Sequence, residues 1–159
     1  MHVKHEYTCH VDVDGVIWHD GEPFDAPELY AIVHRTAEKS EDGRTFATCL
    51  GERLWLECED TPFVVEMVRV ATDAAGRAVG VTLVLKGGVE EPLDPETLTV
   101  GDRNVLYTMV KDAAFRARFT RKAYYELARH LSQRGDEFFL VLGGREYPIS
   151  GEIADDAST

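Results

Sequence analysis

The first candidates for chemistry are two carboxylates in the stretch HVDVDGVIWHD. Asp12 and Asp14 stand two residues apart, just before Gly15. A pair of acids at this spacing can be interpreted as the reactive stretch of an enzyme. The same letters also alternate around an Asp-Gly pair, which is a strong hairpin signal because both residues tolerate positive φ. The surrounding elements have to decide between an active site and a turn.

The stretch resembles the first motif of haloacid-dehalogenase-like phosphatases. That resemblance implies that Asp12 attacks phosphorus and that Asp14 is the general acid and base. It also implies that Mg²⁺ bridges the carboxylates, since a phosphate must be neutralised before an anion can attack it. Under this interpretation Thr72 and Lys86 would contact the phosphate, and Asp102 would bind the metal.

Three features of the sequence favour the turn. The phosphatase core is a parallel sheet with crossovers of a dozen or more residues, and no crossover helix fits between Thr72 and Lys86. A second acid is expected shortly after Asp102, but Arg-Asn-Val-Leu-Tyr-Thr follows. CHVDV alternates as a half-exposed antiparallel strand does, whereas the strand before the nucleophile is usually apolar throughout. We therefore predict a turn at Asp14-Gly15 and keep the Mg²⁺-dependent phosphatase as an alternative.

The composition excludes several classes of partner. The chain has 159 residues, 44% of them hydrophobic, which suits one domain or two small halves with a sizeable core. Its net charge of -12 opposes binding to nucleic acid and to anionic membranes. Cys9, Cys49 and Cys58 are odd in number and lack CxxC spacing, which favours reduced thiols in a cytoplasmic protein. We expect neither a signal peptide nor a membrane-spanning segment.

Hydrophobic periodicity predicts two helices, over about residues 26–39 and 121–133. Asp25 is the expected N-cap of the first helix, with Glu28 completing a capping box and Pro27 in the first turn. Thr120 is the expected N-cap of the second helix. Strands dominate the rest without regular βαβ alternation, so we predict an α+β fold with antiparallel curved sheets.

The order strand, capped helix and hairpin occurs twice along the chain, which suggests a repeat. We accordingly expect an N-terminal half-unit over residues 1–70 and a C-terminal half-unit over residues 71–150, packed as one compact unit. Each would be a helix packed against a strand-rich layer, and residues 151–159 would form a flexible tail. The alternative is coincidence, because capped helices followed by hairpins are common.

Several further motifs resemble the bacterial domain-of-unknown-function family 1285, an uncharacterised group. The resemblance rests on an Asp-Gly hairpin followed by Trp, a Gly-x-Pro step, an E-D-x-P-F strand end, an R-x-x-Y-Y-x-L segment and a closing Gly turn. The matching residues are Asp14, Gly15, Trp18, Gly21, Pro23, Glu59, Asp60, Pro62, Phe63, Ala117, Arg121, Tyr124, Tyr125, Leu127, Gly143 and Gly144. This chain departs from the pattern at Cys58, where Val is expected, and at KDAAF, where Gly-Gly-Leu is expected. The resemblance implies an α+β protein of two similar half-units and a role in signalling or ligand sensing, with no established activity.

A local basic cluster is the best candidate for ligand binding. Arg116 and Arg118 lie two apart on a predicted strand and therefore share a face, and Arg121 follows close by. Near Tyr124 and Tyr125 these arginines could hold an anionic ligand. The alternative is that they pair with the surplus carboxylates, for example Arg118 with Asp60.

The remaining candidates are weaker. Glu57, Glu59 and Asp60 could bind a cation or a basic partner beside the Thr-Pro corner, or lie on a solvated strand face with Asp60 capping the turn. Metal-ligand residue types also gather near the N-terminus, but four of them within nine residues of one strand do not easily surround zinc. They are His2, His5, Cys9 and His10. We expect no metal and no cofactor, and we expect Trp18 and Trp55 to pack rather than to bind one.

The sequence as a whole predicts a non-enzymatic cytoplasmic binding or regulatory module. A small anionic ligand or a protein partner would bind at the seam between the half-units, with no role for nucleic acid or membrane. The predicted binding residues are Asp60, Arg116, Arg118, Arg121 and Tyr125. A structural subunit that forms a homodimer through an exposed strand edge is the second alternative, after the phosphatase.

Overall fold

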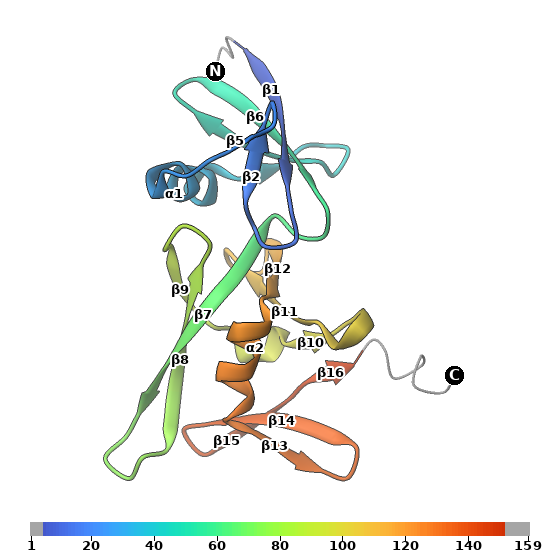
Figure 1. Cartoon of the computed structure of the whole chain (residues 1–159). Coiled ribbons are helices and arrows are strands. Elements are labelled where there is room, and N and C mark those ends of the chain that lie inside the picture. The colour runs from blue at the N-terminus through green and yellow to red at the C-terminus, as the bar shows by residue number, and fades with distance from the viewer. Residues whose placement is uncertain (1–4, 152–159) are drawn as a thin grey trace. The chain divides into compact units, whose positions relative to one another are not determined.

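The computed structural model describes residues 5–151, so most of the predicted tail lies outside the described residues (Figure 1). The predicted α+β fold is confirmed, since two helices accompany mixed, largely antiparallel sheets. The described chain divides into two compact units. Unit 1 runs to Val64 and includes Leu85–Val89, while unit 2 comprises Val65–Val84 and the chain from Glu90 onward. The predicted division into repeated half-units near residue 70 stays a prediction.

Unit 1 contains a six-stranded sheet and one helix. The strand order is β3-β2-β1-β6-β5-β4, in which β1 and β6 are parallel and the other neighbouring pairs are antiparallel. The strands are β1 (Glu6–Val11), β2 (Ile17–His19), β3 (Glu22–Pro23), β4 (Glu38–Lys39), β5 (Thr45–Cys49) and β6 (Glu52–Cys58), and the helix is α1 (Pro27–Thr36).

The core of unit 1 lies on one face of this sheet. Cys9 pairs with Leu56 and Val11 pairs with Ile17, and all four side chains are buried. Residues at alternate positions, such as Thr8, point to the opposite face, which is mainly exposed or half-buried. Helix α1 adds its own buried residues, Tyr30 and Val33, to the core.

Unit 2 contains most of a seven-stranded sheet, a separate three-stranded sheet, one helix and two short 3₁₀ helices. The orders are β16-β10-β11-β12-β7-β8-β9 and β13-β14-β15. The strands are β7 (Phe63–Thr72), β8 (Ala78–Leu85), β9 (Glu90–Pro92), β10 (Thr99–Val100), β11 (Leu106–Val110), β12 (Phe115–Phe119), β13 (Leu131–Arg134), β14 (Glu137–Leu142), β15 (Arg145–Pro148) and β16 (Ser150–Gly151). The helices are η1 (Pro95–Thr97), η2 (Asp102–Asn104) and α2 (Arg121–Ala128).

Both predicted helices exist, but each ends earlier than predicted. Helix α1 ends at Thr36 because the next residues pair with β5 as β4, and α2 ends at Ala128 because the chain continues into β13. Strand pairing thus overrides the helical pattern at both C-terminal ends. Neither helix of the described chain is long and apolar enough to cross a membrane.

One of the two predicted helix N-caps is found in the structure and the other is not. The predicted cap at Asp25 is wrong, since Ala26 occupies the N-cap of α1 and makes no side-chain capping bond, although Pro27 stands in the first turn as expected. The predicted cap at Thr120 is confirmed, since its hydroxyl accepts a hydrogen bond from Ala123 N at 3.1 Å.

The turn between β11 and β12 holds three successive non-glycine residues in the left-handed region. Lys111, Asp112 and Ala113 have φ of 56°, 57° and 64°. A side chain in this conformation brings Cβ close to the backbone, which costs about 1–2 kcal/mol for each residue. These residues belong to the KDAAF stretch, and glycine would adopt the same backbone conformation without this strain.

The strain at Ala113 gives a stability prediction. Ala113→Gly removes the Cβ from a left-handed position and should raise the free energy of unfolding by about 0.5–1 kcal/mol, after the added entropy of the unfolded chain is counted. Ala114→Gly is the matched control, because Ala114 does not have positive φ, and it should lower the free energy of unfolding. Urea unfolding of both variants measures the difference, and equal losses in both would contradict the strain.

Candidate functional site

The stretch DVDGV is a turn between β1 and β2, so the predicted hairpin is confirmed. Asp12 N donates to Val16 O at 3.0 Å, and Gly15 N donates to Asp12 O at 3.0 Å. Asp12 Oδ1 accepts from the backbone N–H groups of Asp14 at 3.0 Å and Val16 at 2.9 Å. Asp12 Oδ2 accepts from Trp18 Nε1 at 2.9 Å. Both carboxylate oxygens of the residue considered as a nucleophile are therefore bound within its own hairpin.

The same backbone turn occurs at four places within residues 5–151, at residues 12–16, 40–44, 73–77 and 85–89. In each, the first N–H donates to the fifth carbonyl, and the fourth N–H donates to the first carbonyl. The fourth residue is always a glycine, with φ between 82° and 91°. Asp12, Ser40 and Asp73 each cap their turn with a side-chain oxygen. The geometry at Asp12 is thus a recurrent turn of this protein rather than a feature special to catalysis.

The turn at residues 12–16 differs from the other three in its surroundings. A Cβ on Gly15 would lie 2.8 Å from Val64 Cβ and 3.1 Å from Lys86 Cβ, whereas nothing lies within 4 Å of that position at Gly43 or Gly76. Gly15 is buried, and the turn therefore packs tightly against two other segments of unit 1.

The acidity of Asp12 follows from these contacts. Partial burial by itself would raise the pKa of the Asp12 carboxyl, but the hydrogen bonds from Trp18, Val16 and Asp14, together with the nearby His10, outweigh burial. The pKa of Asp12 is lowered below its ordinary value of 3.8. The carboxylate is consequently held ionised, as a hydrogen-bond acceptor for the turn.

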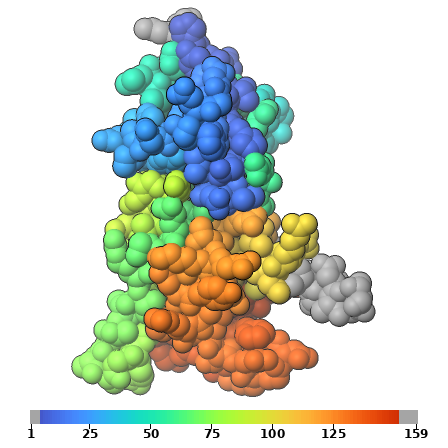
Figure 2. Space-filling view, viewed as in Figure 1, coloured from blue at the N-terminus to red at the C-terminus, as the bar shows by residue number. Residues whose placement is uncertain are grey.

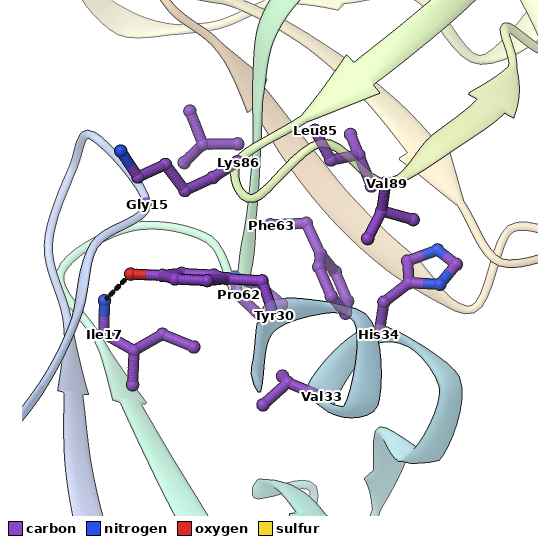
Figure 3. Close-up of a pocket in the computed structure, with 11 residues that line it drawn as sticks. Gly15, Ile17, Tyr30, Val33, His34, Pro62, Phe63, Leu85, Lys86 and Val89 are labelled. Carbon is purple, nitrogen blue, oxygen red and sulfur yellow. Dashed lines mark hydrogen bonds between the residues drawn. The ribbon is translucent and has the colours of Figure 1, made fainter. Parts of the chain in front are cut away.

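A small pocket lies beside this turn, within unit 1 (Figure 3). The Tyr30 hydroxyl accepts from Ile17 N at 3.2 Å and donates to Phe24 O at 2.8 Å, while the His34 ring meets Phe63 edge to face with 5.4 Å between the ring centroids. The cavity volume of about 10 Å³ is room for about one water molecule. Its lining consists of Gly15, Ile17, Tyr30, Val33, His34, Pro62, Phe63, Val64, Leu85, Lys86 and Val89. The pocket is therefore too small in this conformation for a metabolite.

The predicted arginine cluster lies in unit 2. The buried residues of β12 are Phe115, Ala117 and Phe119, so Arg116 and Arg118 share the opposite face, as the spacing predicts. The Arg116 guanidinium carbon lies 3.7 Å from the centroid of the Tyr107 ring. Arg118 is the cross-strand partner of the same Tyr107. One aromatic ring on β11 thus neighbours both arginines.

The other predicted binding residues are divided between the units. Arg121 and Tyr125 lie one turn apart on the exposed side of α2, which reaches the visible surface of unit 2 in orange in Figure 2, and Tyr125 is 59% exposed. Asp60 is half-buried and lies in unit 1, between β6 and β7. Its predicted pairing with Arg118, and a site shared by all five residues, stay predictions.

The remaining candidates have local structural contacts. The Glu59 carboxylate is 2.6 Å from His10 Nε2, and the Thr61 hydroxyl donates to Phe63 O at 2.6 Å. Among residues 5–151, no group of three His, Cys, Asp or Glu side chains is arranged to hold a metal ion. His2, one of the metal-ligand types noted above, lies outside the described residues.

The cysteines are free thiols. Burial raises the pKa of Cys9 to about 11, helped by the nearby charge of Asp20, and raises the pKa of Cys58 to about 11, helped by Asp60. Both are thiols at neutral pH, and a thiol is a far weaker nucleophile than a thiolate. They are therefore poor candidates for covalent chemistry.

The packing of Gly15 gives a second stability prediction. Gly15→Ala should lower the free energy of unfolding by about 3 kcal/mol, because the new methyl group would overlap Val64 in addition to straining the backbone. Gly43→Ala is the matched control, with nearly the same φ of 86° but open space, and should cost about 1 kcal/mol. Chemical unfolding compares them, and equal losses would show that the turn is not packed as described.

The lowered pKa of Asp12 gives a pH prediction. A carboxyl whose pKa is lowered on folding stabilises the protein above its ordinary pKa, and this stabilisation is lost as the pH falls through the folded value. Asp12→Ala should cost about 2 kcal/mol at pH 7, and the cost should shrink as the pH falls below 3.8. Asp73→Ala, in the equivalent turn without a tryptophan donor, should cost less at pH 7. A loss for Asp12→Ala that does not change with pH would contradict the ionised carboxylate.

Comparisons with known proteins agree with the family resemblance at the level of the fold. No family model matches the chain, and no curated protein matches it. A crystal structure of a DUF1285 family protein from Silicibacter pomeroyi has a TM-score of 0.70 at 19% identity, covering 99% of this chain and 86% of that chain. A DUF1285 family protein from Shewanella baltica has a TM-score of 0.60 at 13% identity, covering 76% of this chain and 90% of that chain. The chain therefore has the fold of DUF1285 family proteins, as its motifs predicted.

Proposed function

We propose that this chain is a non-enzymatic binding module with a regulatory role, and that it recognises an anionic group. The observation that carries the proposal is that Arg116 and Arg118 share one face of β12, with the Arg116 guanidinium over the Tyr107 ring and Arg118 opposite Tyr107 in the strand register. Stacking uses the flat face of a guanidinium, so its N–H groups keep their in-plane directions toward acceptors. A carboxylate or a phosphate matches that geometry.

The contacts of Asp12 argue against the phosphatase alternative. A nucleophilic carboxylate needs an oxygen directed at phosphorus and a metal beside it, but both oxygens of Asp12 accept hydrogen bonds from the hairpin. The strand that follows Asp12 is β2, which pairs with β1 antiparallel, whereas the core of the phosphatase fold is a parallel sheet. The same residues thus support a turn as their role.

The free thiols and the acidic composition support a cytoplasmic location for this module. A ligand bound in such a compartment would be a small anion or an acidic segment of a protein. Arg121 and Tyr125, on the exposed side of the neighbouring helix, remain the predicted additional contacts.

Thermal unfolding with phosphate, citrate and AMP tests the proposal. An anion present at about a hundred times its dissociation constant should add about 2.7 kcal/mol of stability, which is visible as a rise in Tm. Arg118→Ala should abolish the rise. Arg145→Ala is the control, since it removes an arginine that lies over another tyrosine ring, that of Tyr147 on β15, and it should keep the rise.

Two outcomes would contradict the proposal. One is an equal rise in Tm in the wild type and in Arg118→Ala, since the anion would then act elsewhere. The other is Mg²⁺-dependent hydrolysis of p-nitrophenyl phosphate that disappears in Asp12→Asn, because Asp12 would then act in catalysis.

A further inference from the structure

A second arginine–aromatic cluster lies in unit 1, on the face of the sheet opposite the core. We call this surface the outer face and define it by residues of the three adjacent strands β1, β6 and β5. The strand registers place Arg53 between Glu6 and Thr48, and Trp55 between Thr8 and Phe46. The core-side neighbours in the same strands are buried, including Cys9, Leu54 and Leu56.

Two guanidinium groups lie over the two rings of the outer face. The guanidinium carbon of Arg44 is 4.0 Å from the Trp55 ring centroid, and that of Arg53 is 4.3 Å from Phe46 and 5.5 Å from Trp55. The rings of Phe46 and Trp55 are themselves 5.3 Å apart. Cation–π contacts of this kind fix the position of a guanidinium without using its N–H groups.

Arg53 makes no ion pair within residues 5–151, although the chain has 29 acidic and 17 basic residues. Glu6 is its direct cross-strand neighbour, yet the Glu6 carboxylate accepts instead from Trp55 Nε1 at 2.6 Å. Arg53 Nε is buried and has no hydrogen-bond partner in the described chain. The positive charge of Arg53 is therefore partly removed from water, while the neighbouring Glu6 carboxylate is hydrogen-bonded to Trp55 instead. A bound anion would compensate this charge.

The burial of Nε limits how Arg53 can bind. Side-on bidentate binding uses Nε with one terminal nitrogen, whereas end-on binding uses the two terminal nitrogens. Because Nε is covered, only the end-on pair can reach an anion. We propose that the outer face binds a monocarboxylate end-on through Arg53, with the apolar body of the ligand against the half-buried Trp55.

The other charges of the outer face favour a carboxylate over a phosphate. Glu6 and Glu57 lie on this face with Arg44 and Arg53, and Glu38 of β4 pairs with Phe46 on the same side, so the carboxylates outnumber the guanidinium groups by one. A dianion would be repelled more strongly than a monoanion by these three glutamates. The hydroxyls of Thr8 and Thr48 flank the position, and neither makes a hydrogen bond within the part of the chain that the structure describes.

NMR titration of ¹⁵N-labelled protein tests this site. Sodium benzoate should shift the Trp55 indole signal and the Arg53 Nε–H signal along one saturable curve. Sodium acetate should act at the same signals with weaker affinity, because it lacks the apolar body. Sodium phosphate at matched ionic strength should bind at least about tenfold more weakly than benzoate.

Two variants make the test specific. Arg53→Lys keeps the charge and the ring contact but loses the paired donors, and should weaken benzoate binding by about tenfold. Arg44→Gln, at the other arginine over Trp55, should leave the affinity within about twofold. Equal losses in both variants, stronger binding of phosphate than of benzoate, or the absence of a saturable shift in the folded wild type would each overturn the proposal. None of these outcomes depends on the arginines of β12.

Discussion

The carboxylate of Asp12 is the constraint on which the architecture of unit 1 depends. It binds two backbone N–H groups of its own turn and the indole of Trp18, and thereby fixes where β2 begins. The turn places Gly15 so close to Val64 and Lys86 that a side chain would not fit. The two carboxylate oxygens of Asp12 thus position the hairpin between β1 and β2. The hairpin in turn contributes Gly15 and Ile17 to the lining of the pocket in Figure 3.

Several residues of the motif that resembles family 1285 take part in this packing. Gly15, Pro62 and Phe63 line the same pocket, and Trp18 binds Asp12. These residues stand almost fifty positions apart in sequence but meet in unit 1. A motif of this kind specifies how segments pack, which explains why it accompanies a shared fold without identifying a reaction.

The sequence predicted those features that local chemistry determines. The hairpin at Asp14-Gly15, the cap at Thr120 and the shared face of Arg116 and Arg118 follow from turn residues, capping and strand alternation, and the structure contains all three. The C-terminal ends of the helices were missed because strand pairing decides them. The stack of Arg53 on Phe46 and Trp55 was missed because it needs the register of β5 on β6, although an alternation of Arg and aromatic residues in RLWLE was visible.

The most direct test of the central claim is a ¹³C NMR titration of the Asp12 carboxyl, with the Trp18 indole N–H followed in the same samples. A structural carboxylate bound on both oxygens should titrate below its ordinary value of 3.8, and the Trp18 signal should shift with the same midpoint. Titration of Asp12 at or above the ordinary value, without a matching shift of Trp18, would contradict the account and return Asp12 to the candidates for catalysis.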